Sequence, residues 1–334
     1  MSDSTSFKAM VVAESGEKTF TREITTKSVD DLPAGDVLIR VHYSSLNFKD
    51  ALSATGNKGV TRKYPHTPGI DAAGVVEESS DSRFSSGQQV IVTSYDLGMN
   101  TSGGFGEYIR VPADWVVPKP DSLSLKEAMI YGTAGYTAGL SVNALAHTVK
   151  PEAGEVLVTG ASGGVGSMAV AILSKLGYQV VAVSGKTSAK DFLTQLGARE
   201  VIDRSEVWDE SGRPVLKSRW AGVIDTVGGN ILGTAIKSTN YNGTVTCCGM
   251  VASPEIPMSV FPFILRNVRL LGIDSQNTPM PLRQQIWDKL AGEWKLEHLD
   301  QILTNEIGLD QLESYIQSIL KGEIAGRTVV DLKP

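Results

Sequence analysis

Apolar residues in the first third of the chain come in short runs that alternate with polar positions. Gly, Pro, Ser and Asp separate these runs, and several of them have the length of a strand. They span residues 7–14, 36–46, 69–79, 87–95 and 106–118. No internal repeat has the period of a solenoid protein. The pattern predicts an irregular, mostly antiparallel β domain.

From about Ser124 the pattern changes to an alternation of helices and strands. Residues 124–145 have helical spacing, and Ser124 and Glu127 form a potential capping box at the start. Strands are predicted at 156–159, 179–185, 200–203, 222–229, 244–249 and 268–274, with helices after 166 up to Lys175 and at 188–198. This alternation predicts a parallel sheet with helices on both faces.

The C-terminal part is predicted to hold helices at 282–294 and 309–322 and a last strand at 326–332. The β-rich first domain needs partners for its edge strands, so we expect the tail to return to it. The predicted fold class is therefore α/β, with a doubly wound parallel sheet and a separate β-rich domain.

A glycine-rich turn directly follows the predicted strand at 156–159 and opens a helix. It reads Gly160-Ala161-Ser162-Gly163-Gly164-Val165-Gly166. Glycines let the backbone approach a pyrophosphate, and the helix N-terminus presents unpaired N–H groups and the positive end of its dipole. The alternative is a tight turn without a ligand. The flanking strand and helix favour a dinucleotide site.

The end of the next predicted strand distinguishes between the two nicotinamide dinucleotides. NAD sites usually carry Asp or Glu here to bind the ribose 2′-OH. This chain has Ser184-Gly185-Lys186-Thr187 instead. A hydroxyl and a cation suit the 2′-phosphate of NADPH. The alternative is that Lys186 and Lys190 are solvated lysines at a helix start; the pattern favours NADPH.

Composition limits the other function classes. The chain has 334 residues, a length typical of about two domains, and a net charge of -6 at pH 7, which argues against a nucleic-acid-binding face. Its two cysteines, Cys247 and Cys248, are adjacent, as suits a reducing compartment. No signal peptide or membrane-spanning run is recognisable. We expect a cytoplasmic protein without a nucleic-acid or membrane partner.

The chain has few residues that suit a metal site or a catalytic nucleophile. Its four histidines are His42, His66, His147 and His298, and it has no separated cysteines. A structural zinc site needs a tetrahedral cluster, usually rich in Cys, so we predict no metal site. No Gly-x-Ser-x-Gly elbow with plausible partners is present, so serine hydrolysis has no support.

Several segments, in this order and spacing, resemble the medium-chain dehydrogenase/reductase superfamily over essentially the whole chain. They are SSLNFKDALSATG, YPHTPGIDAAGVV, GGFGEYIRVPADWVVPKP, YGTAGYTAGLSV, VTGASGGVG, VIDTVGG and LLGIDS. Within the superfamily the chain resembles the zinc-free quinone oxidoreductase branch. Residues 46–50 and 183–186 resemble its acryloyl-CoA reductase-like subgroup. Where zinc-dependent relatives carry a Cys and a Gly-His-Glu motif, this chain has Ser45 to Asn47 and Gly69-Ile70-Asp71.

The resemblance implies a domain organisation and an oligomeric state. Residues 1–125 and 300–334 would form a GroES-like catalytic domain, and residues 126–299 a Rossmann domain that binds NADPH. A homodimer would form through the last Rossmann strand, at 268–273. An apolar edge strand that pairs across a two-fold axis would cover its unpaired edge.

The resemblance also implies site residues. Asn47 and Asp50 are the catalytic candidates, although Asn47 would equally cap the following turn and Asp50 the helix start. Thr133 would contact the nicotinamide end of the cofactor, unless its segment serves only close helix packing. Further cofactor candidates are Val227, Gly249 and Arg327, the last of which would otherwise be a surface arginine. Tyr43, Tyr95 and Tyr131 are proton-donor candidates by position alone.

The function implied is an NADPH-dependent, zinc-independent enzyme that reduces the activated C=C bond of a small 2-enoyl thioester such as acryloyl-CoA. One alternative is an NADPH:quinone oxidoreductase, and another is a non-enzymatic NADPH-binding sensor or structural protein. A CoA ester requires a basic entrance for its phosphates, and a quinone requires a flat apolar slot. Arg266, Arg269 and Arg283 either supply that entrance or are ordinary surface charges.

Overall fold

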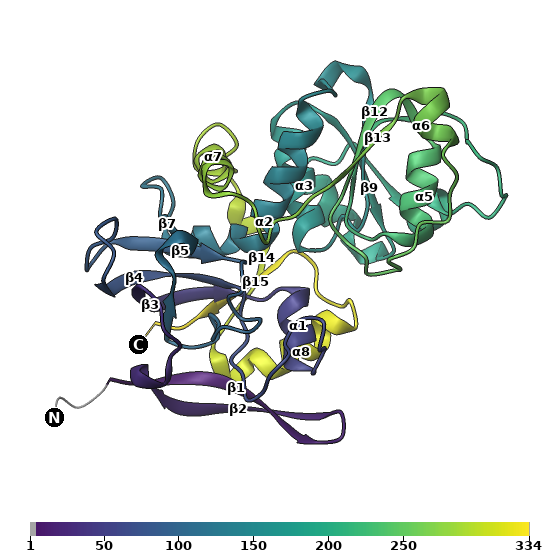
Figure 1. Ribbon diagram of the computed structural model, residues 1–334. Coiled ribbons are helices and arrows are strands. Elements are labelled where there is room, and N and C mark those ends of the chain that lie inside the picture. The colour runs from purple at the N-terminus through teal and green to yellow at the C-terminus, as the bar shows by residue number, and fades with distance from the viewer. Residues whose placement is uncertain (1–4, 334) are drawn as a thin grey trace. The chain divides into compact units, whose positions relative to one another are not determined.

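The computed structural model describes residues 5–333, which form two units (Figure 1). The first unit comprises the chain up to Thr133, Gln276–Ala291 and the chain from Ile302 onward; the second comprises Ala134–Ser275 and Gly292–Gln301. Within the described range, no helix combines the length and the apolar character needed to span a membrane.

The first unit contains a seven-stranded sheet and a separate hairpin. The hairpin pairs β1 (Ser6–Gly16) with β2 (Thr19–Ser28). The larger sheet has the order β14-β15-β3-β4-β5-β7, with β6 paired to β3, and all its pairs except β14-β15 are antiparallel. Its strands are β3 (Val37–Ser45), β4 (Asp71–Ser79), β5 (Gln89–Thr93), β6 (Tyr108–Val111), β7 (Val116–Pro118), β14 (Leu303–Ile307) and β15 (Arg327–Asp331).

The C-terminal tail returns to this sheet, as the sequence predicts. Strand β15 pairs with β3 and places Val329 opposite Ser45. Helices α1 (Phe48–Ala54) and α8 (Leu312–Leu320) lie side by side (Figure 1). Arg327, at the start of β15, thereby reaches the chain segment that leads from β3 into α1.

The second unit is built on six parallel strands in the order β10-β9-β8-β11-β12-β13. In chain order this is 3-2-1-4-5-6, the strand order of the Rossmann fold, so the predicted α/β fold class is confirmed. The strands are β8 (Glu155–Val158), β9 (Gln179–Ser184), β10 (Glu200–Asp203), β11 (Trp220–Asp225), β12 (Thr239–Cys247) and β13 (Arg269–Gly272). The helices include α3 (Gly164–Lys175), α4 (Lys190–Gln195), α5 (Gly229–Lys237) and α6 (Phe261–Arg266).

Near-continuous apolar runs explain why these strands are buried. Leu157, Val181, Val223 and Val245 come from four neighbouring strands, and each is 0% exposed. Strands covered on both faces need apolar residues at successive positions, whereas half-exposed strands alternate. Strand β2 alternates and is mostly exposed or half-buried, in accord with its place in a two-stranded hairpin.

The helix predicted at 124–145 is interrupted. Ser124 and Glu127 form the predicted capping box, but α2 (Leu125–Ala146) contains Gly132 at φ 49° and ψ −158°, where two helical segments meet. A Cβ atom at this position would lie 2.6 Å from Asp71 Oδ2 and from Ser45 Oγ. Glycine is therefore needed because the backbone passes directly over a buried polar cluster.

Candidate functional site

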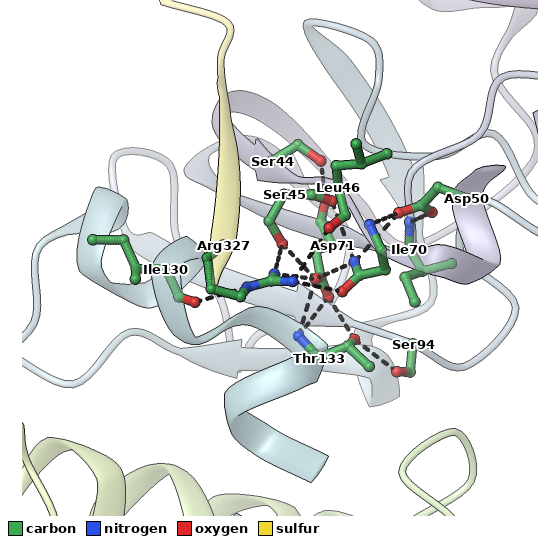
Figure 2. Close-up of polar contacts among 11 residues, drawn as sticks. Ser44, Ser45, Leu46, Asp50, Ile70, Asp71, Ser94, Ile130, Thr133 and Arg327 are labelled. Atoms are coloured by element: carbon green, nitrogen blue, oxygen red, sulfur yellow. Dashed lines mark hydrogen bonds and ion pairs between the residues drawn. The ribbon is translucent and has the colours of Figure 1, made fainter. Parts of the chain in front are cut away.

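A cluster of buried polar side chains lies within the first unit, where β3, β4 and β15 meet the start of α1 (Figure 2). We call Ser45, Asn47, Asp50, Asp71, Thr133 and Arg327 the Asp71 cluster. Asp50 and Asp71 are fully buried, and Arg327 is 3% exposed. Such a concentration of charge in an interior requires mutual pairing and complete hydrogen bonding.

Hydrogen-bond donors surround the carboxylate of Asp71. Oδ2 accepts bonds from Ser45 Oγ at 2.6 Å and Asn47 Nδ2 at 2.8 Å. Oδ1 accepts a 2.6 Å bond from the Thr133 hydroxyl, and the Thr133 N–H points at both oxygens. A carboxylate that accepts from every side is held in one orientation.

The Thr133 hydroxyl connects Asp71 to Ser94. Its Oγ1 atom lies 2.9 Å from Ser94 Oγ. A hydroxyl has one proton, and Thr133 directs that proton to Asp71, so Ser94 must be the donor in this pair. Figure 2 shows the resulting line from Ser94 through Thr133 to Asp71. Thr133 is only partly buried, whereas the other residues of the Asp71 cluster are buried.

Asp50 is the second carboxyl group of the cluster. It accepts hydrogen bonds from the backbone N–H groups of Asn47 at 2.7 Å and Ile70 at 2.8 Å. Burial is the main cause that raises the pKa of Asp50 to about 7, and the charge of Asp71 adds to it, while these hydrogen bonds oppose the shift. Asp50 therefore retains its proton to a higher pH than an ordinary carboxyl group does.

Arg327 supplies the positive charge of the cluster. Its guanidinium donates to Ser45 Oγ at 2.7 Å and Asn47 Oδ1 at 3.1 Å, and to the carbonyls of Ile130 and Leu46. Burial lowers the pKa of Arg327, and the nearby carboxylates oppose that shift. The alternative of a surface arginine is wrong, because internal bonds engage a buried guanidinium. The contact predicted between Arg327 and the cofactor stays a prediction.

Asn47 stands at the start of α1, and its side chain faces the cluster. The Nδ2 group donates to Asp71 and to the Ser45 carbonyl, while Oδ1 accepts from Arg327. Asp50 caps the helix start, since its carboxylate accepts the Asn47 N–H. Direct contact of Asn47 with a substrate stays a prediction.

The glycine-rich turn in the second unit links β8 to α3. Gly163 is the N-cap residue of α3; Ser162 precedes it, and Gly164 and Val165 are the first residues of the helix. A Cβ atom at Gly166 would lie 2.3 Å from the Gly160 carbonyl oxygen, so the fold itself needs glycine there. At Gly163 the nearest atom would be 3.4 Å away, which an alanine tolerates. The glycine at 163 therefore suits the close approach of a ligand.

Polar groups gather at the carboxyl end of β9. Ser184 Oγ accepts the Lys186 N–H at 3.0 Å. Arg204 was not predicted from the sequence. It follows Asp203 of β10, and Asp203 pairs with Ser184 of β9. A Cβ atom at Gly185 would lie 3.1 Å from Arg204 Cδ. The end of the neighbouring parallel strand was the signal that could have identified Arg204.

Asp225 shapes the turn at the end of β11. It is fully buried and accepts bonds from Thr159 Oγ1 at 2.7 Å and the Gly228 N–H at 2.8 Å. Burial raises the pKa of Asp225. The turn carries Val227, whose carbonyl accepts the Ala252 N–H.

The end of β12 lies beside that turn. A Cβ atom at Gly249 would come within 1.9 Å of the Thr226 carbonyl oxygen. The structure thus brings Val227 and Gly249 to adjacent strand ends. Burial is the main cause that raises the pKa of Cys248 to about 12, so this thiol packs rather than reacts.

The arginines suggested for a basic entrance have other roles. Arg283 is 0% exposed, so both alternatives considered for it, a basic entrance and a surface charge, are wrong. Arg266 donates to the carbonyls of Leu216, Lys237 and Thr239. Tyr43 and Tyr131 are buried in the core, which leaves Tyr95 as the more accessible of the three tyrosines.

Comparison with known proteins places these features in context. The family model "Alcohol dehydrogenase GroES-like domain" matches residues 33–121, and "Zinc-binding dehydrogenase" matches residues 164–292. Among residues 5–333, no three His, Cys, Asp or Glu side chains are grouped to hold a metal ion, so the zinc of the second model's description does not fit this chain. Ser45, Asn47 and Asp71 instead take part in the Asp71 cluster.

Two similar relatives are named for different substrates. One is the quinone oxidoreductase YhfP of Bacillus subtilis, with 46% identity over 98% of this chain and 100% of the relative. The other is the acrylyl-CoA reductase AcuI of Escherichia coli, with 46% identity over 97% of this chain and 99% of the relative.

Two solved structures match nearly the whole chain. Escherichia coli YhdH with bound NADPH has a TM-score of 0.94 and 45% identity, over 97% of this chain and 100% of that one. Bacillus subtilis YhfP with bound NAD has a TM-score of 0.95 and 45% identity, over 98% of this chain and 100% of that one.

Proposed function

Because this chain belongs to the medium-chain dehydrogenase/reductase family, we propose that it is an NADPH-dependent oxidoreductase acting on the C=C bond of a small 2-enoyl thioester of the acryloyl-CoA type. The observation that carries the proposal is the buried Asp71 cluster, which holds a proton near neutral pH beside a partly exposed hydroxyl. We further propose that residues 1–125 and 300–334 form the GroES-like catalytic domain and that residues 126–299 form the Rossmann domain.

The cofactor assignment rests on two groups of residues in the second unit. The turn Gly160–Gly166 and the N-terminus of α3 would hold the pyrophosphate. Ser184, Lys186 and Arg204 would bind the 2′-phosphate, because a hydroxyl and two cations suit a dianion. We assign Val227 and Gly249 to the adenine or ribose part of the cofactor, and Thr133 to its nicotinamide end. Arg327 we assign to the Asp71 cluster as its counter-charge.

Bound NADPH supplies the hydride that the β-carbon of the substrate accepts. The thioester carbonyl then develops enolate charge, and the α-carbon needs a proton. We assign delivery of this proton to the Thr133 hydroxyl. The proton that it gives up is replaced from solvent, and Oδ1 of Asp71, which accepts the hydroxyl's hydrogen bond at 2.6 Å, orients the hydroxyl.

Solvent and the carboxyl groups of Asp50 and Asp71 complete the proposed reaction scheme. Burial and the charge of Asp71 raise the pKa of Asp50 to about 7, and a proton retained on Asp50 limits the negative charge of the cluster. Asn47 Nδ2 lies 2.8 Å from Asp71 and 3.3 Å from Asp50, so this amide orients both. The net reaction consumes NADPH and one proton and forms NADP⁺ and the saturated thioester.

Quinone reduction on the same scaffold is the second candidate. It has the support of YhfP, which matches as closely as AcuI and carries a quinone oxidoreductase name. A quinone accepts a hydride and a proton at oxygen, so the same proton-holding cluster would serve it.

The test measures NADPH consumption with acryloyl-CoA and with 1,4-benzoquinone, with NADH as the cofactor control. Faster turnover of the thioester with NADPH supports the first candidate, and quinone turnover alone transfers the proposal to the second. Deuterium labelling adds a check. Label from [4-²H]NADPH should appear at the β-carbon and label from ²H₂O at the α-carbon. No turnover of either substrate would overturn the proposal.

We also propose a homodimer in a reducing, cytoplasmic environment. Strand β13 is an edge strand of its sheet, and α6, which precedes it in the chain and packs on β12, exposes apolar side chains. Exposed residues there are Val260, Phe261, Ile264, Leu265 and Leu271. A second copy of the chain would cover both the strand edge and this patch. The free thiols of Cys247 and Cys248 suit a reducing environment.

A further inference from the structure

Two consecutive residues after β5 have a backbone conformation that side chains disfavour. Ser94 has φ 62° and Tyr95 has φ 50°, and neither is glycine. Residues in the left-handed region persist only where surrounding contacts hold them, and such positions are often found at functional sites. This turn carries the Ser94 hydroxyl that donates to Thr133.

Arg283, on α7 (Met280–Ala291), holds this turn from one side. Its Nη1 atom donates to both the carbonyl oxygen and Oγ1 of Thr93, each at 3.0 Å. Its guanidinium lies 4.2 Å from the centre of the Tyr95 ring. That ring stacks on Trp115, with centroids 5.6 Å apart and an interplanar angle of 6°. Tyr95 is thus held between a cation and an indole.

Backbone bonds fix the same turn. The Ser94 N–H donates to the Ile70 carbonyl at 2.7 Å, directly before Asp71. The Tyr95 N–H donates to the Gln276 carbonyl, which also accepts a bond from Arg283 Nη2 at 3.2 Å. The position of Ser94 Oγ therefore depends on contacts made by the Arg283 side chain.

We propose that Arg283 is a positioning residue for the reduction. It holds the Ser94–Tyr95 turn so that Ser94 donates to Thr133 and thereby sets the direction in which the Thr133 hydroxyl points. This inference rests on the proposed function, in which Thr133 delivers the proton. Arginine is required because its planar fork binds Thr93 and Gln276 while its face covers Tyr95, which an ammonium group does not reproduce.

The experiment is a double-mutant cycle with Arg283→Lys and Ser94→Ala, measured as kcat and KM for acryloyl-CoA or the quinone. Each single variant should lose about tenfold in kcat with little change in KM, since one positioning bond is lost. The double variant should be no slower than the slower single variant. NADPH affinity, measured by fluorescence titration, should not change, because these residues lie outside the proposed cofactor residues.

Arg266→Lys is the matched control. Arg266 also donates to several backbone carbonyls, but it belongs to the second unit, whereas the Ser94–Tyr95 turn belongs to the first. The Arg266→Lys variant should have a lower free energy of unfolding than the wild type but the same kcat. Thr93→Val removes only one acceptor of Arg283 and keeps the shape of the side chain, so it serves if Arg283→Lys does not fold.

The outcomes separate the two proposals. An inactive wild-type enzyme contradicts the proposed function, whatever the variants do. With an active wild type, multiplicative losses in the double variant, or an equal kcat loss in Arg266→Lys, would overturn the role of Arg283. If Thr93→Val replaces Arg283→Lys in the cycle, kcat losses that multiply with the loss in Ser94→Ala would also overturn the role of Arg283. A double variant that is no slower than the slower single variant would support this role.

Discussion

Nη2 of Arg327 lies 3.8 Å from Oδ2 of Asp71, and both side chains are buried. Asp50 adds a second buried carboxyl group to the same cluster. One guanidinium balances one carboxylate, so the other carboxyl group retains its proton to a higher pH than usual. Burial is the main cause of the raised pKa of Asp50, at about 7, and the charge of Asp71 adds to it.

Replacing Arg327 should destabilise the protein strongly. In Arg327→Met, two buried carboxyl groups lose their counter-charge, and a loss of about 3–5 kcal/mol in the free energy of unfolding is expected. Urea denaturation at pH 7 measures it. Arg83→Met is the control, because Arg83 pairs with exposed Asp81 and Asp114 at the surface and its loss should change little. Equal effects from the two variants would contradict the cluster's electrostatic role.

Asp50 should make the protein less stable as pH rises. Its pKa in the folded state, about 7, lies above the ordinary value of 3.8, so the folded state binds more protons than the unfolded chain between these values. Stability from this group is complete below pH about 4 and declines until pH about 7. The difference in unfolding free energy between wild type and Asp50→Asn should therefore shrink or reverse from pH 5 to pH 8.

Asp81→Asn serves as the control for this pH series. The bonds from Arg83 lower the pKa of Asp81 to about 2, so its titration falls below the range measured. If the free energy of unfolding depends on pH in the same way in the wild type and in Asp50→Asn, then Asp50 does not titrate in this range.

The sequence predicted most strands because burial on two faces leaves an apolar run that can be read directly. Strand β2 was missed, since its residues TFTREITTKS lie in an exposed hairpin with few apolar positions. The break at Gly132 was also missed, because its cause is contact with Asp71 and Ser45, far away in the chain. Sequence periodicity carries no information on such a contact.

The candidate site was only partly predictable for the same reason. Asn47, Asp50, Thr133 and Arg327 were named from the resemblance, but nothing local indicated that they share a cluster. Asp71 was noted only where zinc-dependent relatives have a ligand motif. Its position at the start of an apolar strand, GIDAAGVV, was the available signal, because a carboxylate there is buried and needs partners.

Thr133→Val should slow the proposed reaction without unfolding the protein. The variant keeps the shape of the side chain and the N–H bonds to Asp71, but loses the hydroxyl that donates to Oδ1. We expect kcat to fall about 100-fold, in the range of general acid catalysis, while Thr133→Ser retains most of it. In the wild type, kcat/KM should fall as pH rises above about 7, because Asp50 loses its proton and the cluster gains a second negative charge. Unaltered kcat in Thr133→Val would exclude this hydroxyl as the donor.

Arg204→Ala should weaken the binding of NADPH and leave that of NADH unchanged. A charge-assisted bond to phosphate contributes about 1.5–3 kcal/mol, which corresponds to about 10- to 100-fold in Kd. Fluorescence titration of both cofactors measures the effect. Lys190→Ala is the control, since Lys190 is exposed one turn further along. Equal weakening of NADPH and NADH would place Arg204 away from the 2′-phosphate.

Ile264→Asp should convert the proposed homodimer into a monomer. Ile264 on α6, the helix that precedes the edge strand β13, is 73% exposed, and a charge there would be buried against its copy in a dimer. Sedimentation velocity at micromolar concentration should show a dimer for the wild type and a monomer for the variant, with NADPH binding retained. Ile24→Asp on the β1–β2 hairpin is the control, as Ile24 is also exposed and lies in the other unit. A monomeric wild type, or dissociation caused equally by Ile24→Asp, would show that α6 and β13 do not form the interface.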